Sequence, residues 1–203
     1  MKTVIKLIIA LVAIFGLTTS VRAQVEGQEE RILLRAAEKV AQMNDYISKM
    51  ADKKNSLNFR LRRKEKALNL FVGKGYEYIE NGVEKEGVQM QVTSKNRAKV
   101  GQPLMRDYFD NLVGKKLDKM YDDVHIEATE VAKIKVSELQ KLDENLWECT
   151  CEYDQAFVGY RDGRPVYRDI TTKRIKCYVI AEDTEDGWEF IILLGDVYAI
   201  KTR

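Results

Sequence analysis

Hydrophobic periodicity divides the chain into a helical N-terminal part and a C-terminal part built from strands. Between residues 28 and 53, apolar side chains recur at alternating spacings of four and three, which places them on one face of a helix. These residues are Ala36, Val40, Met43, Ile47 and Met50. A second, shorter helix is expected within residues 66–78. A third is expected from about Pro103, because proline is favoured in the first turn of a helix.

From His125 onward the period changes to two, which is typical of strands. Four alternating runs follow, at about 125–137, 146–160, 165–181 and 188–201, and polar turn-forming segments separate them. Short connections between long strands favour antiparallel hairpins, and residues 88–92 also alternate like a strand. The predicted fold class is therefore α+β. N-terminal helices would pack on a curved, mostly antiparallel sheet that ends in a four-stranded meander, and strands of this length would twist into a cone-like shape.

The residues before the first predicted helix have the pattern of a secretory signal. A basic start precedes an apolar run at 7–17, and Val21, Arg22 and Ala23 fit a small-residue cleavage site. Because a membrane-spanning helix needs about 20 apolar residues, cleavage after Ala23 is favoured over an uncleaved anchor. The predicted organisation is a signal peptide at 1–23, an N-terminal helix and basic linker at 24–58, and a cone-like domain at 59–203. The product would be periplasmic or secreted, with no transmembrane segment.

Charge gives a second reason to separate the signal from the rest. The chain has 34 basic and 32 acidic residues, but three of the basic ones lie in the first 23, so the remainder is close to neutral. This balance argues against nucleic acid as a partner. Basic residues are dense at 53–66. They would be either a solvated stretch or a surface for an anionic membrane or polysaccharide, and the candidates are Arg60, Arg62, Arg63 and Lys64.

Alternation also predicts which polar side chains point inward. Glu130 shares a side with Ile126 and Ile134, and Gln155 shares a side with the apolar residues of the second run. Buried polar groups need partners or line a cavity, so the pocket candidates are Glu130, Gln155, Asp196 and Tyr198. Burial would raise the pKa of a carboxyl there and suit it to acid or base chemistry. Alternatively, Glu130 reaches water at a bulge or edge, and Asp196 caps a turn or pairs with an arginine.

The three cysteines allow two interpretations. A three-residue loop at 162–164 would place Cys149 opposite Cys177, whereas a five-residue loop would place Cys151 there. One cross-strand disulfide would then form in an oxidising compartment. The other interpretation is three small buried thiols. Their spacing to His125, the single histidine, matches no metal motif, so no metal site is expected.

The order of these elements resembles the nuclear-transport-factor-2-like cone fold of the ketosteroid isomerase type, in exported versions from Bacteroidetes-type bacteria. The segments that carry the resemblance are 66–71, 88–94, 108–112 and 193–197, together with the hairpin at 155–157 and 160–167. The resemblance covers about residues 59–203. No catalytic motif of that superfamily matches here, so it implies no catalytic residue. Because the fold hosts enzymes, binding modules and dimerisation domains, it does not choose among them.

The sequence therefore favours an exported, non-enzymatic domain without a cofactor, which binds a small ligand or an envelope protein or pairs its sheet with a second copy. The alternative is a small pocket enzyme in which Glu130 or Asp196 carries a proton. A third interpretation is an adaptor that uses the basic stretch. A continuous pocket would favour ligand binding or catalysis, whereas a filled cone would favour a scaffold. The residues that would fill it are Trp147, Phe157, Trp188 and Phe190.

Overall fold

The computed structural model describes residues 2–80, 82–96, 99–114, 120–185 and 187–203. In chain order the elements are α1 (Lys2–Ala51), α2 (Leu57–Leu68), η1 (Val72–Gly75), β1 (Tyr78–Glu80), β2 (Val83–Lys85), α3 (Met105–Val113), β3 (Asp123–Ile126), η3 (Val131–Lys133), β4 (Lys135–Val136), β5 (Gln140–Asp143), β6 (Leu146–Arg161), β7 (Arg164–Thr184) and β8 (Gly187–Thr202).

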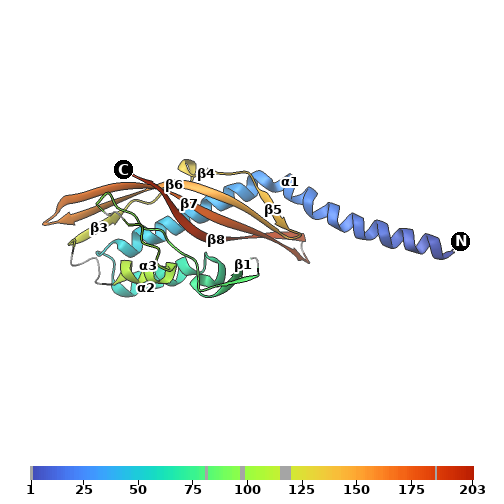
Figure 1. The fold of residues 1–203 in the computed structure, drawn as a ribbon, viewed down its shortest axis with the longest axis horizontal. Helices are drawn as coiled ribbons and strands as arrows, with labels where there is room; N and C mark the ends of the chain where they lie inside the picture. The colour runs from blue at the N-terminus through green and yellow to red at the C-terminus, as the bar shows by residue number, and fades with distance from the viewer. Residues whose placement is uncertain (1, 81, 97–98, 115–119, 186) are drawn as a thin grey trace.

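The three helices lie along one face of a curved antiparallel sheet (Figure 1). Strand order is β3-β6-β7-β8, and β4 and β5 also pair with β6. The long strands β6, β7 and β8 form a meander, and α1 runs along the sheet while its N-terminal part extends past it (Figure 1). The α+β class, with helices on one face of a curved sheet, is confirmed. Within the described residues, no helix combines the length and apolarity needed to cross a bilayer.

The core lies between α1 and the sheet. All five residues of the predicted α1 face are completely buried, although the helix begins at Lys2 and ends at Ala51 rather than spanning 28–53. Trp147 and Phe190 are buried, and Phe157 and Trp188 pack against the same cluster from its margin. Aromatic side chains thus fill this part of the cone, as expected of a packed core.

The second helix lies earlier than predicted. Helix α2 covers residues 57–68, so most of the basic stretch at 53–66 is helical, including the last two residues of the predicted linker. Ser56 caps the helix, with its Oγ accepting a hydrogen bond from the Phe59 backbone N–H at 3.3 Å. Residues 72–75 form only a short 3₁₀ turn, where Gly73 and Lys74 have positive φ. Apolar residues are sparse in α2, so its sequence shows no clear helical period. The Ser56 cap marks where the helix begins.

The first predicted strand, 125–137, is wrong as a continuous element. Strand β3 ends at Ile126, opposite Phe157, and β4 resumes at Lys135, opposite Glu152. Residues 127–134 therefore span only four residues of β6, and they leave the sheet to form η3. Strand β5 occupies part of the segment expected to be a turn.

The connection between β6 and β7 is a two-residue turn, shorter than either predicted loop. Its central residues, Asp162 and Gly163, both have positive φ, as a type I′ hairpin requires. A bulge at Gly159/Tyr160 shifts the register by one residue. Cys149 consequently lies opposite Cys177, the pairing predicted from the three-residue loop.

The outer edge of β8 is covered by irregular segments. Phe71 forms a parallel bridge to Leu194, and Met90 forms one to Val197. Residues 88–92 are thus extended, with Val88 and Met90 buried as alternation predicts, but they make isolated bridges rather than a strand. This covering protects an edge that would otherwise expose unpaired backbone groups.

Candidate functional site

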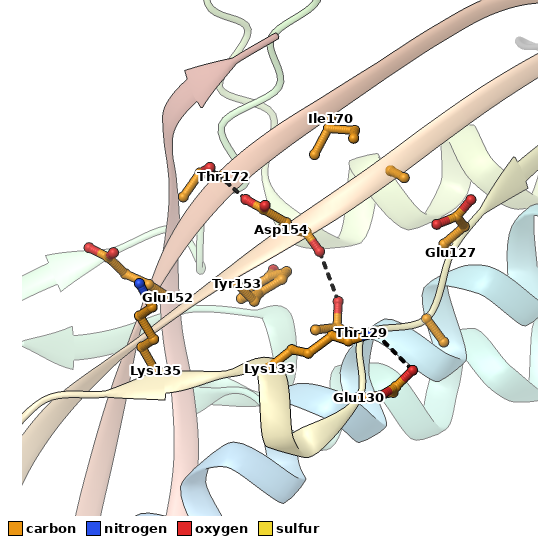
Figure 2. A pocket seen from close by; sticks show the side chains of 12 residues that line it. Glu127, Thr129, Glu130, Lys133, Lys135, Glu152, Tyr153, Asp154, Ile170 and Thr172 are labelled. Atoms are coloured by element: carbon orange, nitrogen blue, oxygen red, sulfur yellow. Dashed lines mark hydrogen bonds and ion pairs between the residues drawn. The ribbon is translucent and has the colours of Figure 1, made fainter.

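An open groove of about 500 Å³ lies where residues 127–134 leave the sheet (Figure 2). The Glu127 backbone N–H donates to the Ala156 carbonyl, and the Thr129 hydroxyl donates to the Asp154 carbonyl, which ties the excursion to the β6 edge. The lining residues are Glu127, Ala128, Thr129, Glu130, Lys133, Lys135, Glu152, Tyr153, Asp154, Ala156, Ile170 and Thr172. The groove is lined largely by polar and charged side chains.

Glu130 lies on this groove and not inside the cone. Its side chain is 70% exposed and pairs with Lys133 at 2.9 Å (Figure 2). The prediction that it faces the core is wrong, because residues 127–134 are not a strand and do not alternate. Asp154 accepts hydrogen bonds from Thr172 and Arg203, which lower the pKa of its carboxyl. Solvated, paired carboxylates of this kind are poor proton carriers at neutral pH.

A second cluster of polar side chains is buried between the helices and the sheet. The inward-facing residues of β6 and β7 are apolar near the start of β6. Nearer the β6–β7 turn they are polar. In antiparallel register, Tyr153 lies opposite Lys173 and Gln155 opposite Thr171. The buried polar residues are Asn44, Gln155, Asp169, Thr171 and Lys173. We call these five residues, with Tyr153, the inner polar cluster.

Part of this cluster is satisfied internally. Gln155 Nε2 donates to Asn44 Oδ1 at 2.9 Å, and Asn44 Nδ2 donates to the Val40 carbonyl at 3.0 Å. The inward position predicted for Gln155 is therefore confirmed. Its amide serves to join α1 to β6, since a buried amide without a partner would be costly.

Lys173 is the charged member of the cluster with the weakest hydrogen bonding. It is 4% exposed, and among the described residues its Nζ has one hydrogen-bond partner, Met90 Sδ, at 3.3 Å. The ammonium also lies 5.8 Å from the ring centroid of Tyr108. Burial lowers the pKa of Lys173 from 10.5 to about 8, against the opposing attraction of the Asp169 carboxylate. A thioether is a weak acceptor for a buried charge.

The Tyr153 hydroxyl is buried and, among the described residues, forms no hydrogen bond of normal geometry, although the Asn44 side chain lies close enough to interact with it. Burial raises the pKa of this phenol, as it does for Tyr108 on α3. Both hydroxyls therefore stay protonated and can donate hydrogen bonds. Because Lys173 lies opposite Tyr153, the inner polar cluster contains more hydrogen-bond donors than it has acceptors to pair with them.

Asp169 connects the inner polar cluster to the rim near the β6–β7 turn. The Tyr167 hydroxyl donates to Asp169 Oδ2 at 2.5 Å and lies 2.8 Å from Ser94 Oγ. The Tyr167 ring also contacts the rings of Tyr121 and Phe157. Aromatic side chains thus lie beside the polar interior on this side.

Asp196 and Tyr198 lie on the opposite face of the sheet from the one predicted. A bulge in β8, between the pairs Ile175–Val197 and Cys177–Leu194, inserts one residue and reverses which side chains point inward. Leu194 and Val197 are buried, whereas Asp196 Oδ1 accepts the Gln89 N–H at 2.8 Å. Asp196 therefore bonds to the backbone of the extended segment at 88–92, and among the described residues this partner is neither a turn nor an arginine.

The basic candidates on α2 mostly have partners within the fold. Arg60 donates from Nε to the Met50 carbonyl and from Nη2 to the Leu112 carbonyl, each at 2.7 Å, so it joins the ends of α1 and α3. The Arg63 guanidinium lies 4.5 Å from the Phe59 ring centroid, and Lys64 pairs with Asp110. Arg62 is exposed. Three of the four residues thus stabilise helix packing.

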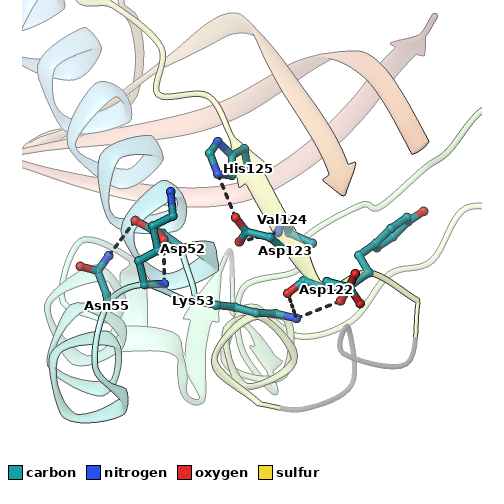
Figure 3. A network of polar contacts seen from close by, with 9 residues as sticks. Asp52, Lys53, Asn55, Asp122, Asp123, Val124 and His125 are labelled. Carbon is teal, nitrogen blue, oxygen red and sulfur yellow. Dashed lines mark hydrogen bonds and ion pairs between the residues drawn. The ribbon is translucent and has the colours of Figure 1, made fainter. Parts of the chain in front are cut away.

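The segment around His125 is a structural junction (Figure 3). His125 Nε2 lies 3.2 Å from Asp123 Oδ2, and Lys53 Nζ donates to the Tyr121 and Asp122 carbonyls at 3.0 and 3.1 Å. Among the described residues, no group of three or more His, Cys, Asp or Glu side chains could hold a metal ion. The junction ties the end of α1 to β3.

The three cysteines are buried free thiols on the inner face of β6 and β7. Cys151 Sγ lies 3.6 Å from Cys177 Sγ, whereas the backbone of Cys177 is opposite Cys149. Cys177 is therefore adjacent to both of the other thiols.

Sequence reasoning missed Lys173, Thr171 and Asp169. The signal was present, since these residues share the parity of Ile175 and Cys177 in an alternating run. Asn44 was also readable, because it follows Val40 by four residues on the apolar face of α1. The orphan Tyr153 hydroxyl needed tertiary structure.

Comparison with known proteins yields a single distant similarity to report. No protein-family model matches the sequence, and no curated protein is similar to it. The chain is similar to a crystal structure of a protein assigned as a scytalone dehydratase from Novosphingobium aromaticivorans. Sequence identity is 12%, 89% of this chain and 90% of that chain are covered, and the TM-score is 0.38. At this TM-score the similarity does not assign the chain to a family.

Proposed function

We propose that this domain is an exported binding protein for a small, largely apolar molecule with an anionic or hydrogen-bond-accepting group. The acceptor group would lie between Lys173 and Tyr153, and the apolar part would face the aromatic side chains of the core. Such a ligand would supply a hydrogen-bond acceptor for the donors of the inner polar cluster. Ligand sites are commonly apolar with a few placed polar groups, and the inner polar cluster would supply such groups beside an apolar core.

The observation that carries this proposal is the incompletely partnered Lys173 ammonium. Burying a charge without a good acceptor costs stability, and a residue that carries this cost is a candidate for a functional site. Methionine or leucine would fill the same space without that cost. An acceptor from a ligand would pair with the ammonium and with the orphan Tyr153 hydroxyl at once.

Anilinonaphthalene sulfonate, a fluorescent apolar anion, provides the first test. We expect saturable binding with one molecule per chain, weakened at least tenfold in Lys173→Met and in Tyr153→Phe. Lys66→Met is the matched control, because Lys66 is exposed on α2 and its loss should leave binding unchanged. Equal affinity in wild type and Lys173→Met, with both folded by circular dichroism, would refute the proposal.

Native mass spectrometry of protein isolated from its own cells provides a test with the natural ligand. An adduct of constant mass, present in wild type and absent from Lys173→Met, is the expected result. Wild type and variant with identical masses, apart from the substitution, would count against a resident ligand.

Export is tested separately. The N-terminal pattern supports cleavage after Ala23, so N-terminal sequencing of the protein from the periplasm or medium should begin at Gln24. Recovery of the full chain only in the cytoplasmic fraction would contradict this part of the proposal.

One observation favours a second function, general acid–base chemistry. With a pKa of about 8, a fraction of Lys173 is neutral near physiological pH and could accept a proton from a bound substrate. Such an enzyme would use Lys173 rather than Glu130 or Asp196, because both carboxylates lie outside the inner polar cluster. Turnover that rises with pH up to about 8 and disappears in Lys173→Met would distinguish catalysis from binding alone.

A further inference from the structure

We propose that the thiols on the inner face of β6 and β7 are an oxidation site, at which Cys151 and Cys177 form a cross-strand disulfide and Cys149 remains reduced. The proposal concerns thiols that border the inner polar cluster, two residues from Tyr153 and four from Lys173, but it does not depend on a ligand. It rests on the arrangement of three thiols around one strand pair.

The two sulfurs of the proposed bond are already in contact. Cys151 Sγ and Cys177 Sγ are 3.6 Å apart, and both side chains are completely buried among apolar neighbours. Cys151 pairs directly with Ile175, so Cys151 and Cys177 are diagonal neighbours on adjacent antiparallel strands, at a spacing slightly above the usual range of a disulfide. Rotation of the two side chains, with a small shift of the strands, would bring the sulfurs to bonding distance.

Cys149 is the competing partner, because its backbone lies directly opposite Cys177. Two bonds to Cys177 cannot coexist, so one of the two thiols on β6 must remain free. Cys149 also lies close enough to Cys177 to act on its pKa, and the 3.6 Å contact between Cys151 Sγ and Cys177 Sγ is the basis for choosing Cys151. Three cysteines therefore yield one disulfide and one thiol.

The oxidant is a small-molecule disulfide, such as oxidised glutathione, or an exchange enzyme of the same chemistry. One thiolate attacks the oxidant and releases its first thiol. The second protein thiolate then attacks the mixed disulfide and releases the second thiol. Two protons and two electrons leave the cysteines, and the oxidant becomes two thiols. Neighbouring thiols and burial raise the pKa of Cys177, so the bond should form during folding, before the sheet closes.

Refolding of the reduced full chain in a glutathione redox buffer tests the proposal. Afterwards the denatured, unreduced protein should contain one free thiol in wild type, none in Cys149→Ser, and two in Cys151→Ser and in Cys177→Ser. Three free thiols in refolded wild type would overturn the proposal. The absence of any free thiol in Cys151→Ser would show that Cys149 is the partner and would overturn the choice of Cys151.

Thermal unfolding supplies a readout that does not depend on thiol chemistry. A disulfide that closes the long β6–β7 hairpin should raise the melting temperature of Cys149→Ser by about 5–10 °C over its reduced form. Cys177→Ser should melt at one temperature with or without reductant. Identical melting of oxidised and reduced Cys149→Ser would refute a stabilising bond.

Discussion

Lys173 shows how one side chain can cost stability at a place where apolar residues would serve the fold better. Its two neighbours on the same face, Thr171 and Ile175, are completely or almost completely buried, as it is itself. Natural proteins retain such costs where a site needs the group, and replacements there tend to stabilise. Lys173→Met should therefore raise stability while abolishing ligand binding.

The pH dependence of that gain follows from the lowered pKa. Below pH 8 both folded and unfolded chains carry the ammonium, so its burial costs the folded state about 3 kcal/mol. Between pH 8 and 10.5 the folded state has already lost the proton, and wild-type stability rises. The advantage of Lys173→Met should thus be about 3 kcal/mol at pH 7 and below about 1 kcal/mol at pH 10.

Urea denaturation followed by circular dichroism measures this difference at the two pH values. Lys66→Met is the control, and its effect should be small at both. A stability gain of Lys173→Met that does not change with pH would show that the ammonium is not desolvated.

Arg60 is a residue whose charge serves helix packing. Its guanidinium bonds to carbonyls at the ends of α1 and α3, groups that a helix leaves without partners. Arg60→Met should cost about 2 kcal/mol of unfolding free energy. Arg62→Met, two residues away and exposed, should change it by less than about 0.5 kcal/mol. Equal effects in chemical denaturation would contradict the capping role.

At the scale of elements, bulges decide which side chains point inward. The bulge in β8 moves Asp196 and Tyr198 to the outer face, and the bulge at Gly159 restores the register that faces Cys149 toward Cys177. Alternation alone correctly predicted the inner face of β6 as far as Phe157. It failed wherever a strand gained one residue or left the sheet, because neither event changes the residue pattern locally.

Substitution of Gly159 tests the packing of Tyr121 beside the bulge in β6. A Cβ at this position would overlap the ring of Tyr121, which packs against Phe157 and Tyr167. Gly159→Ala should therefore destabilise the fold by about 1–3 kcal/mol, measured by thermal or urea unfolding. Gly27→Ala is the matched control. Gly27 lies in α1 with open space around it, so alanine there should be neutral or stabilising by up to about 1 kcal/mol. A neutral Gly159→Ala would mean that Tyr121 moves freely.

For the whole molecule, the predicted cleavage site after Ala23 leads to a prediction about stability. Described core residues of α1 begin at Val25 and continue to Ala51, so the sheet is covered by the part of the helix that export would retain. A chain that begins at Gln24 should melt within about 2 °C of the full chain. A fall of 10 °C or more would show that the first 23 residues stabilise the domain.

The sequence alone determined the periods of the chain: the helical face of α1, the long strands, and hence helices on one face of an antiparallel sheet. These features follow from the local spacing of apolar residues, which can be read directly along the sequence. Only tertiary structure decided where bulges reverse a strand, how residues 127–134 leave the sheet, and that Arg60 joins two helix ends. It alone also showed that Lys173 and Tyr153 are buried together with too few acceptors, because hydrogen-bond satisfaction depends on partners far apart in the chain.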